Sequence, residues 1–336
     1  MTTTDPTAHR WGDSQRTSDA PASTASRSFG AMFDSICANI AGAVHGKDDV
    51  IRLTVTCLIA GGHLLIEDVP GVGKTTIAKA LARSVDGSFG RVQFTPDLLP
   101  SDVLGSSVWN QGDGSFEFRA GPVFHHLVLS DEINRASPKT QSALLEAMAE
   151  EQVTVDGTTY PLPRPFMVVA TQNPIEHQGT FPLPESQLDR FLMRLSVGYP
   201  GRAAEIALLV EPDHGHQLNR LRPVVTTDDV LAMRAAASSV HVSNAVAGYL
   251  VDLAERSRRS PAFSLGMSPR ASLGLLGASQ VHAAGSGRDY VTPDDVKDLA
   301  VPVLAHRVVL APESQLRGVA AADAVAELLA TTPVPS

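Results

Sequence analysis

The chain has 336 residues, of which 43% are hydrophobic and 19% charged, enough apolar material for two compact domains. Its 26 glycines and 23 prolines are too few for a low-complexity chain, which excludes a mostly disordered protein. The formal net charge of −9 argues against nucleic-acid binding as the main function, because neutralising phosphates requires an excess of lysine and arginine on at least one face.

The first residues predict neither a folded element nor a targeting segment. Residues 1–28 are rich in threonine, serine, alanine and aspartate and lack an apolar run, which predicts a disordered tail and no signal peptide. Residues 53–66 and 235–251 are the least charged stretches, and polar residues interrupt both, so no membrane span is expected. Cys37 and Cys57 lack metal-ligand spacing and are expected to be reduced and buried. We therefore expect a cytoplasmic protein.

Two domains are expected after the tail. Over residues 29–199, helix-like and strand-like segments alternate, which is typical of a parallel sheet with crossover helices. Beyond Pro200 and Gly201 the strand-like segments stop, and the apolar stretches that follow indicate helices. The sequence therefore predicts a smaller all-α domain over residues 200–336.

A glycine-rich loop follows the first expected strand, residues 63–66, and leads into a helix. Backbone N–H groups at such a helix N-terminus can cradle a phosphate. Lys74 would then reach the β- and γ-phosphates, and the Thr75 hydroxyl would ligate Mg²⁺. An ordinary glycine turn is the alternative, but the strand, the helix and the Lys-Thr pair together favour nucleotide binding. The residues expected to bind nucleotide here are Val69, Pro70, Gly71, Val72, Gly73, Lys74, Thr75 and Thr76.

One residue departs from the phosphate-loop pattern. The pattern G-x-x-x-x-G-K-[ST] places glycine at position 68, and this chain has Asp68 there. The later part of the pattern, from Gly73 to Thr75, is intact.

Polar side chains end two later strands. Asp131 and Glu132 follow the apolar residues 127–130; the first can hold Mg²⁺ through water, and the second can polarise a water for attack on the γ-phosphate. Asn173 ends the strand expected over residues 166–173, and its amide can orient that water. Each feature alone fits an ordinary turn, but the phosphate loop upstream favours the catalytic interpretation.

Two hairpins are expected to interrupt the alternation of strands and helices. Residues 107–118 turn around Gly112-Asp113-Gly114, and residues 152–160 turn around Asp156-Gly157.

Five segments together resemble the MoxR family of AAA+ ATPases: Lys74-Thr75, DEINRA at 131–136, ATQNP at 170–174, PESQLDRF at 184–191 and GMSPRA at 266–271. The resemblance covers residues 44–310. It implies an α/β P-loop AAA+ core with a central parallel sheet, flanking helices and β-hairpin insertions, plus a smaller all-α lid.

The resemblance also implies ligands and partners. ATP and Mg²⁺ would bind at the interface between subunits of a ring-shaped homo-oligomer, usually a hexamer. Family members are similar to chaperones that remodel or mature client complexes, often with partner proteins that carry a von Willebrand factor A domain. The two hairpins would be family insertions that face the pore or the client.

Carried over residue by residue, the resemblance assigns Lys74 and Thr75 to Walker A, Asp131 and Glu132 to Walker B, and Asn173 to sensor 1. The segment that lines the adenine pocket in the family corresponds to Val44, His45, Gly46 and Lys47.

Three arginines are candidates for contact with the γ-phosphate. Arg190 resembles the finger that reaches a neighbouring subunit, although its acidic neighbours also fit a plain salt bridge. Arg270 resembles sensor 2 in the lid; it follows Ser268 in a first helical turn, where the helix dipole disfavours a cation, and such a broken local rule is expected at a functional site. The alternative is a solvated surface arginine. Arg135, beside the acidic pair, is the competing candidate for the finger.

The sequence thus predicts an ATPase that couples hydrolysis to the remodelling of client complexes. One alternative is a nucleotide-gated scaffold with little turnover, which the intact Glu132, Asn173 and Arg190 disfavour. Another is a DNA-translocating machine, which the acidic balance disfavours.

Overall fold

The computed structural model describes residues 28–112, 114–174, 179–210 and 214–335. The tail predicted over residues 1–28 lies outside the described residues except for Ser28. The Ser28 hydroxyl accepts a hydrogen bond from the Ala31 N–H at 3.3 Å and so caps helix α1 (Phe29–Ala41).

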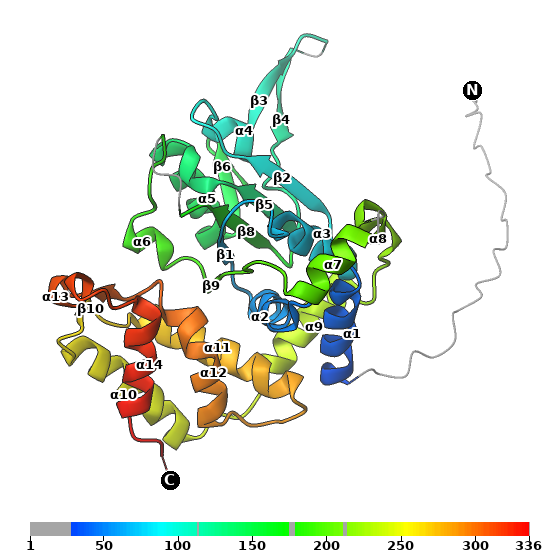
Figure 1. The fold of residues 1–336 in the computed structure, drawn as a ribbon. Helices are drawn as coiled ribbons and strands as arrows, with labels where there is room; N and C mark the ends of the chain where they lie inside the picture. Colours follow the sequence, from blue (N-terminus) through cyan, green and yellow to red (C-terminus); the bar gives the residue numbers. More distant parts are fainter. Residues whose placement is uncertain (1–27, 113, 175–178, 211–213, 336) are drawn as a thin grey trace, which may run out of the picture.

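A five-stranded sheet forms the centre of the upper half of the molecule in Figure 1. Its strand order is β2-β5-β8-β1-β9, and all pairs are parallel. The segments that follow the strands therefore meet at one edge of the sheet, the carboxyl edge, and the segments that precede them meet at the opposite, amino edge. The strands are β1 (Leu64–Glu67), β2 (Phe89–Gln93), β5 (Leu127–Asp131), β8 (Met167–Gln172) and β9 (Met193–Leu195).

Different helices cover the two faces of the sheet. In β1, Leu64 and Ile66 belong to a core that also contains apolar residues of α1, α2 and α3, whereas Leu65 belongs to a second core with α5. This division follows from the strand pleat, which points successive side chains to opposite faces. Because both faces are covered, the strand reads as a continuous apolar run. The remaining helices of these layers are α2 (Asp48–Ile59), α3 (Lys74–Ser84) and α5 (Pro138–Glu150).

Both predicted hairpins are present. In the second, Asp156 and Gly157 have φ values of 50° and 78°, and positive values at both central residues are what a type I′ turn requires. The first hairpin projects from the top of the molecule in Figure 1, and it carries exposed aromatic rings of Trp109 and Phe116. These insertions and the short helices beside them are α4 (Pro100–Leu104), β3 (Gly105–Asn110), β4 (Ser115–Ala120), η1 (Ile133–Arg135), β6 (Gln152–Val155), β7 (Thr158–Pro161) and α6 (Glu185–Leu188).

Helices dominate the chain after β9. Residues 196–201, which we call the β9–α7 loop, connect the sheet to α7 (Arg202–Val210) and α8 (His214–Arg220). We call the elements from α9 onwards the lid; they lie below the sheet in Figure 1, where α11 contacts α1 and α2, and α12 contacts β9. The lid elements are α9 (Thr227–Ser238), α10 (Asn244–Arg259), β10 (Phe263–Leu265), α11 (Pro269–Gly285), α12 (Pro293–Leu304), β11 (Val309–Leu310), α13 (Pro312–Leu316) and α14 (Ala321–Thr331).

One expectation about the lid is corrected. Strands do not stop at residue 201, because β10 and β11 pair as a short antiparallel ribbon within the lid. The ribbon is too short to produce an alternating pattern in the sequence. The domain boundary predicted between residues 199 and 200 falls within the β9–α7 loop and stays a prediction.

Candidate active site

The phosphate loop connects β1 to α3 at the carboxyl edge of the sheet. Gly71 and Gly73 have φ values of 85° and 94°. Residues with a side chain are strained in this backbone conformation, whereas glycine adopts it freely. Gly73 is the N-cap of α3, so the loop ends where the unpaired N–H groups and the positive end of the helix dipole coincide. This arrangement favours an anionic ligand over the loop.

Lys74 is the first residue of α3 and folds back over the loop. Its Nζ donates a hydrogen bond to the backbone oxygen of Asp68 at 2.7 Å. The ammonium group is thereby held at the start of the loop, next to the backbone of Asp68.

The acidic pair lies at the end of β5. Asp131 is 7% exposed; its Oδ2 pairs with the Arg91 Nε at 2.7 Å, and its Oδ1 accepts a hydrogen bond from Thr171 Oγ1 at 3.3 Å. Both interactions leave lone pairs on the carboxylate. A hydroxyl at Thr75 and a carboxylate at Asp131 are the hard oxygen donors that Mg²⁺ prefers, so this donor set fits the metal.

Glu132 turns away from the strand with a positive φ of 56°. Its Oε2 accepts a hydrogen bond from Gln93 Nε2 at 2.9 Å and pairs with Arg135 Nε at 3.3 Å. Arg135 is therefore engaged with the acidic pair of its own subunit, which does not favour it as the finger for a neighbouring one. Gln93, at the end of β2, is a contact that the sequence analysis missed because β2 itself was not predicted.

Asn173 follows β8 directly and is 6% exposed. Strand β8 lies between β5 and β1 in the sheet. The acidic pair, Asn173 and the phosphate loop thus stand at the ends of three neighbouring strands, and the structure brings them to one edge of the sheet.

A cavity of about 210 Å³ adjoins the phosphate loop. Lys47, from the segment assigned to the adenine pocket, lines it, and so do Ala43 and Pro200, which the sequence analysis missed. Lys47 Nζ donates to the Tyr199 backbone oxygen at 2.8 Å, which holds the β9–α7 loop beside the cavity. The other predicted residues that line it are Val44, His45, Gly71, Val72, Gly73 and Thr76; Gly46, Val69, Pro70, Lys74 and Thr75 lie outside the lining.

Arg190 and Arg270 lie at the opposite, amino edge of the sheet. Both line a cavity of about 520 Å³ together with Gly62 and His63, which directly precede β1. Strand β1 separates this cavity from the phosphate loop, and its four residues span about 13 Å. The structure therefore does not bring Arg190 or Arg270 together with the phosphate loop of the same subunit.

A third arginine, Arg307, fixes the segment that carries Arg190. Its side chain is 3% exposed, its Nη2 donates to the backbone oxygens of Asp189 and Phe191 at 3.2 and 2.8 Å, and its Nε lies 3.4 Å from Asp189 Oδ1. Burial lowers the pKa of Arg307 to about 10, so it remains a cation at neutral pH. Sequence reasoning missed it because its partners lie more than 100 residues away, at separations of 116 and 118.

The chain is similar to known ATPases over most of its length. Residues 63–193 match the model of the ATPase family associated with various cellular activities (AAA), and residues 255–328 match the AAA lid domain. Chaperone MoxR1 of Mycobacterium tuberculosis is 40% identical over 86% of this chain and 79% of its own length. Protein MoxR of Paracoccus denitrificans is 34% identical over 91% of this chain and 97% of its own length.

The chain belongs to the MoxR family of AAA+ ATPases. Two further relatives are similar to this MoxR protein over most of its length. YeaC of Bacillus subtilis is 48% identical over 86% of this chain and 91% of its own length. A crystal structure from Cytophaga hutchinsonii superimposes with a TM-score of 0.84 at 36% identity, covering 92% of this chain and 96% of the other. The predicted family, fold class and ATPase activity are thus confirmed.

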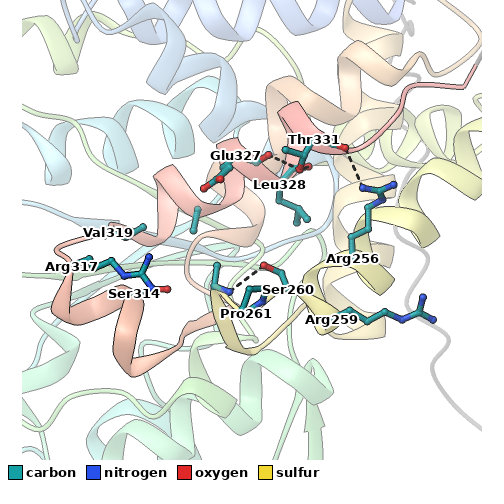
Figure 2. A pocket seen from close by; sticks show the side chains of 12 residues that line it. Arg256, Arg259, Ser260, Pro261, Ser314, Arg317, Val319, Glu327, Leu328 and Thr331 are labelled. Carbon is teal, nitrogen blue, oxygen red and sulfur yellow. Dashed lines mark hydrogen bonds between the residues drawn. The ribbon is translucent and has the colours of Figure 1, made fainter.

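The lid of the MoxR protein has a cavity of its own, of about 510 Å³ (Figure 2). Arg256, Arg259 and Arg317 surround it. Arg256 donates to the Thr331 backbone oxygen at 3.2 Å, and Arg259 pairs with Glu255 at 2.9 Å, so both already have partners. All of its lining residues come from the lid, which separates this cavity from the phosphate loop.

Two expectations concern the MoxR chain as a whole. Cys37 and Cys57 are buried free thiols, as predicted, and burial raises the pKa of each to about 12. In the described part of the chain, no helix is both long enough and apolar enough to cross a membrane.

Proposed function

We propose that this MoxR ATPase hydrolyses ATP at the interface between neighbouring subunits of a ring, usually a hexamer in this family, and uses the cycle to remodel client protein complexes. The observation that carries the proposal is the division of the site between two edges of the sheet. The phosphate loop, the acidic pair and Asn173 lie at the carboxyl edge, and Arg190 and Arg270 lie at the amino edge.

The residues at the carboxyl edge bind and activate within one subunit. The loop amides and Lys74 bind the phosphates, and Lys74 exchanges the Asp68 carbonyl for them. Glu132 accepts a proton from the attacking water, and Asn173 orients that water. Thr75 and Asp131 would hold Mg²⁺, which supplies positive charge against the β- and γ-phosphates when bound.

The arginines complete the site of a neighbour. A head-to-tail interface places the amino edge of one subunit against the carboxyl edge of the next, and repetition of that contact closes a ring. Arg190 and Arg270 then stabilise the charge on the transferring phosphoryl group across the interface. A division of the site in this way also explains why the cation at the start of α11 is tolerated: its anionic partner belongs to the other subunit.

Client remodelling is proposed from a relative and from one surface. The Mycobacterium tuberculosis relative is named a chaperone. On the projecting β3–β4 hairpin, Trp109 and Phe116 are 51% and 71% exposed and lie edge to face at 5.1 Å. Exposed aromatic pairs of this kind can bind apolar segments of another protein. A partner with a von Willebrand factor A domain is proposed on the family resemblance.

Affinity capture with a hydrolysis-deficient variant tests this function. Glu132→Gln with ATP and Mg²⁺ should hold the ATP-bound ring on its partners, which mass spectrometry then identifies. Lys74→Ala, which cannot bind nucleotide, is the matched control. Enrichment of a protein with a von Willebrand factor A domain by Glu132→Gln relative to Lys74→Ala supports the proposal. Equal recovery by both variants contradicts nucleotide-dependent engagement.

A further inference from the structure

Asp68 stands where the phosphate-loop pattern has glycine, and its side chain is engaged. Asp68 is 8% exposed. Its Oδ2 accepts hydrogen bonds from Ser196 Oγ at 2.9 Å and from the Gly198 N–H at 2.6 Å, and its Oδ1 accepts one from the Val69 N–H at 2.8 Å. The backbone at Asp68 does not have a positive φ, so glycine is not required at this position.

The partners of Asp68 come from the β9–α7 loop. Strand β9 pairs in parallel with β1, so the two chain segments leave the carboxyl edge of the sheet side by side. Asp68 follows β1, and Ser196 follows β9. The carboxylate therefore joins the start of the phosphate loop to the start of the connection that leads to the lid.

The same loop forms part of the nucleotide cavity. Lys47 Nζ donates a hydrogen bond to the Tyr199 backbone oxygen at 2.8 Å, and Asp68 accepts hydrogen bonds from Ser196 and Gly198. These two side chains fix the residues of the loop that precede Pro200. Pro200 lines the cavity together with Gly71 and Gly73 of the phosphate loop. A free β9–α7 loop would leave this wall without support.

We propose that Asp68 is a positioning residue for nucleotide binding, which fixes the β9–α7 loop against the phosphate loop and so holds Pro200 in the wall of the cavity. This inference rests on the nucleotide site proposed above. It also connects nucleotide entry to the lid: when Lys74 leaves the Asp68 carbonyl for a phosphate, the residue that changes partners is the one that anchors the connection to the lid.

The electrostatics of the contact favour a carboxylate. Burial by itself raises the pKa of Asp68, and the hydrogen bonds from Gly198, Ser196 and Val69 lower it further than burial raises it. The group is therefore an anion at neutral pH, and its hydrogen bonds are of the stronger, charge-assisted kind. A neutral amide retains one acceptor oxygen, and glycine retains none.

The decisive variant is Asp68→Gly, which restores the usual phosphate-loop pattern and removes the anchor. We expect a fluorescent ATP analogue to bind this variant about ten-fold more weakly, as the loss of about one charge-assisted hydrogen bond implies. The analogue should dissociate faster in stopped-flow measurements, and KM should rise more than kcat falls. Asp68→Asn should lie between the wild type and Asp68→Gly, which keeps the test valid if the glycine variant does not fold. Asp86→Gly is the matched control, because Asp86 is exposed and already has a positive φ of 51°.

Hydrogen exchange gives a second readout. In the wild type, the analogue should slow amide exchange across residues 196–201; in Asp68→Gly this segment should exchange quickly with or without nucleotide. Unchanged affinity together with unchanged exchange in Asp68→Gly overturns the inference. Lys74→Ala separates the two proposals: if it loses nucleotide binding while Asp68→Gly does not, only the role of Asp68 fails, and if Lys74→Ala still binds, the nucleotide site itself is wrong.

Discussion

Subunit mixing can determine in which subunit Arg270 acts. If Arg190 and Arg270 both lie on the face that a subunit offers to its neighbour, Arg190→Ala and Arg270→Ala damage the same face. A mixed ring of these two variants then has no complete interface. If Arg270 instead served the nucleotide of its own subunit, an Arg190→Ala subunit would find an intact Arg190 on an Arg270→Ala neighbour and would recover activity.

The expected magnitudes follow from the geometry. Strand β1 alone separates the two edges by about 13 Å, so neither arginine is expected to reach the phosphate loop of its own subunit. An arginine supplied in trans is worth roughly 10³–10⁵ in rate, so each single variant should be nearly inactive. With Lys74→Ala as the partner at equal amounts, about a quarter of the interfaces combine an intact loop with an intact arginine face. Mixtures of Lys74→Ala with either arginine variant should therefore recover on the order of a tenth or more of wild-type activity.

The assay is phosphate release across mixing ratios after subunit exchange, with exchange verified by fluorescence transfer between labelled subunits. Three mixtures are compared: Arg270→Ala with Lys74→Ala, Arg190→Ala with Lys74→Ala, and Arg190→Ala with Arg270→Ala. We expect recovery in the first two and none in the third. Recovery in the third mixture refutes a shared arginine face. If no mixture recovers although exchange is verified, hydrolysis requires every site of the ring to be intact, and single-site complementation fails.

Three further predictions concern single residues. Lys74→Ala should abolish ATP binding, whereas Glu132→Gln should bind normally and turn over on the order of 10²–10⁴ more slowly; equal affinity losses in equilibrium binding would contradict these roles. Asp295→Ala, which removes the buried partner of Arg288, should lower the free energy of unfolding by about 3 kcal/mol at pH 7 in denaturant titrations. Burial by itself raises the pKa of Asp295, but the hydrogen bonds from Arg288, His282 and Thr292 together outweigh it and hold the pKa below 3.8, so this difference should shrink as the pH falls below that value. Burial lowers the pKa of His63 from 6.5 to about 4, so the unfolded chain binds more protons than the folded one between these pH values. The free energy of unfolding should therefore fall by up to about 3 kcal/mol as the pH is lowered through this interval. A His63→Gln variant whose free energy of unfolding falls just as much with pH would refute His63 as the cause.

The sequence was informative where structure is local. The phosphate loop, the acidic pair and Asn173 each follow a strand that is buried on both faces, and such strands are visible as apolar runs. Strand β2 was not predicted because Arg91 and Gln93 interrupt its apolar pattern, and β9 has only three residues. Contact between distant segments was also invisible: Asp68 and Ser196 are 128 residues apart.

The placement of Arg270 illustrates the same limit at the level of domains. Its position at the start of α11 could be read from Ser268 and Pro269, and the structure has Ser268 as the N-cap with its hydroxyl 3.0 Å from the Ala271 N–H. Which edge of the sheet it faces depends on how the lid packs against α1, α2 and β9. That packing is a sum of apolar contacts between surfaces, and no short segment of the sequence encodes it.

The two buried thiols give this ATPase an internal probe of its own opening. With a pKa of about 12, each is almost entirely protonated at pH 8, and the protonated form does not react with maleimides or disulfide reagents. Labelling must therefore wait until a segment detaches and the thiol regains its ordinary acidity. Cys37 lies in α1 and Cys57 in α2, so the labelling rate of each reports how often its own helix leaves the core. Comparing the two rates with and without ATP would rank these helices by local stability without any added label site.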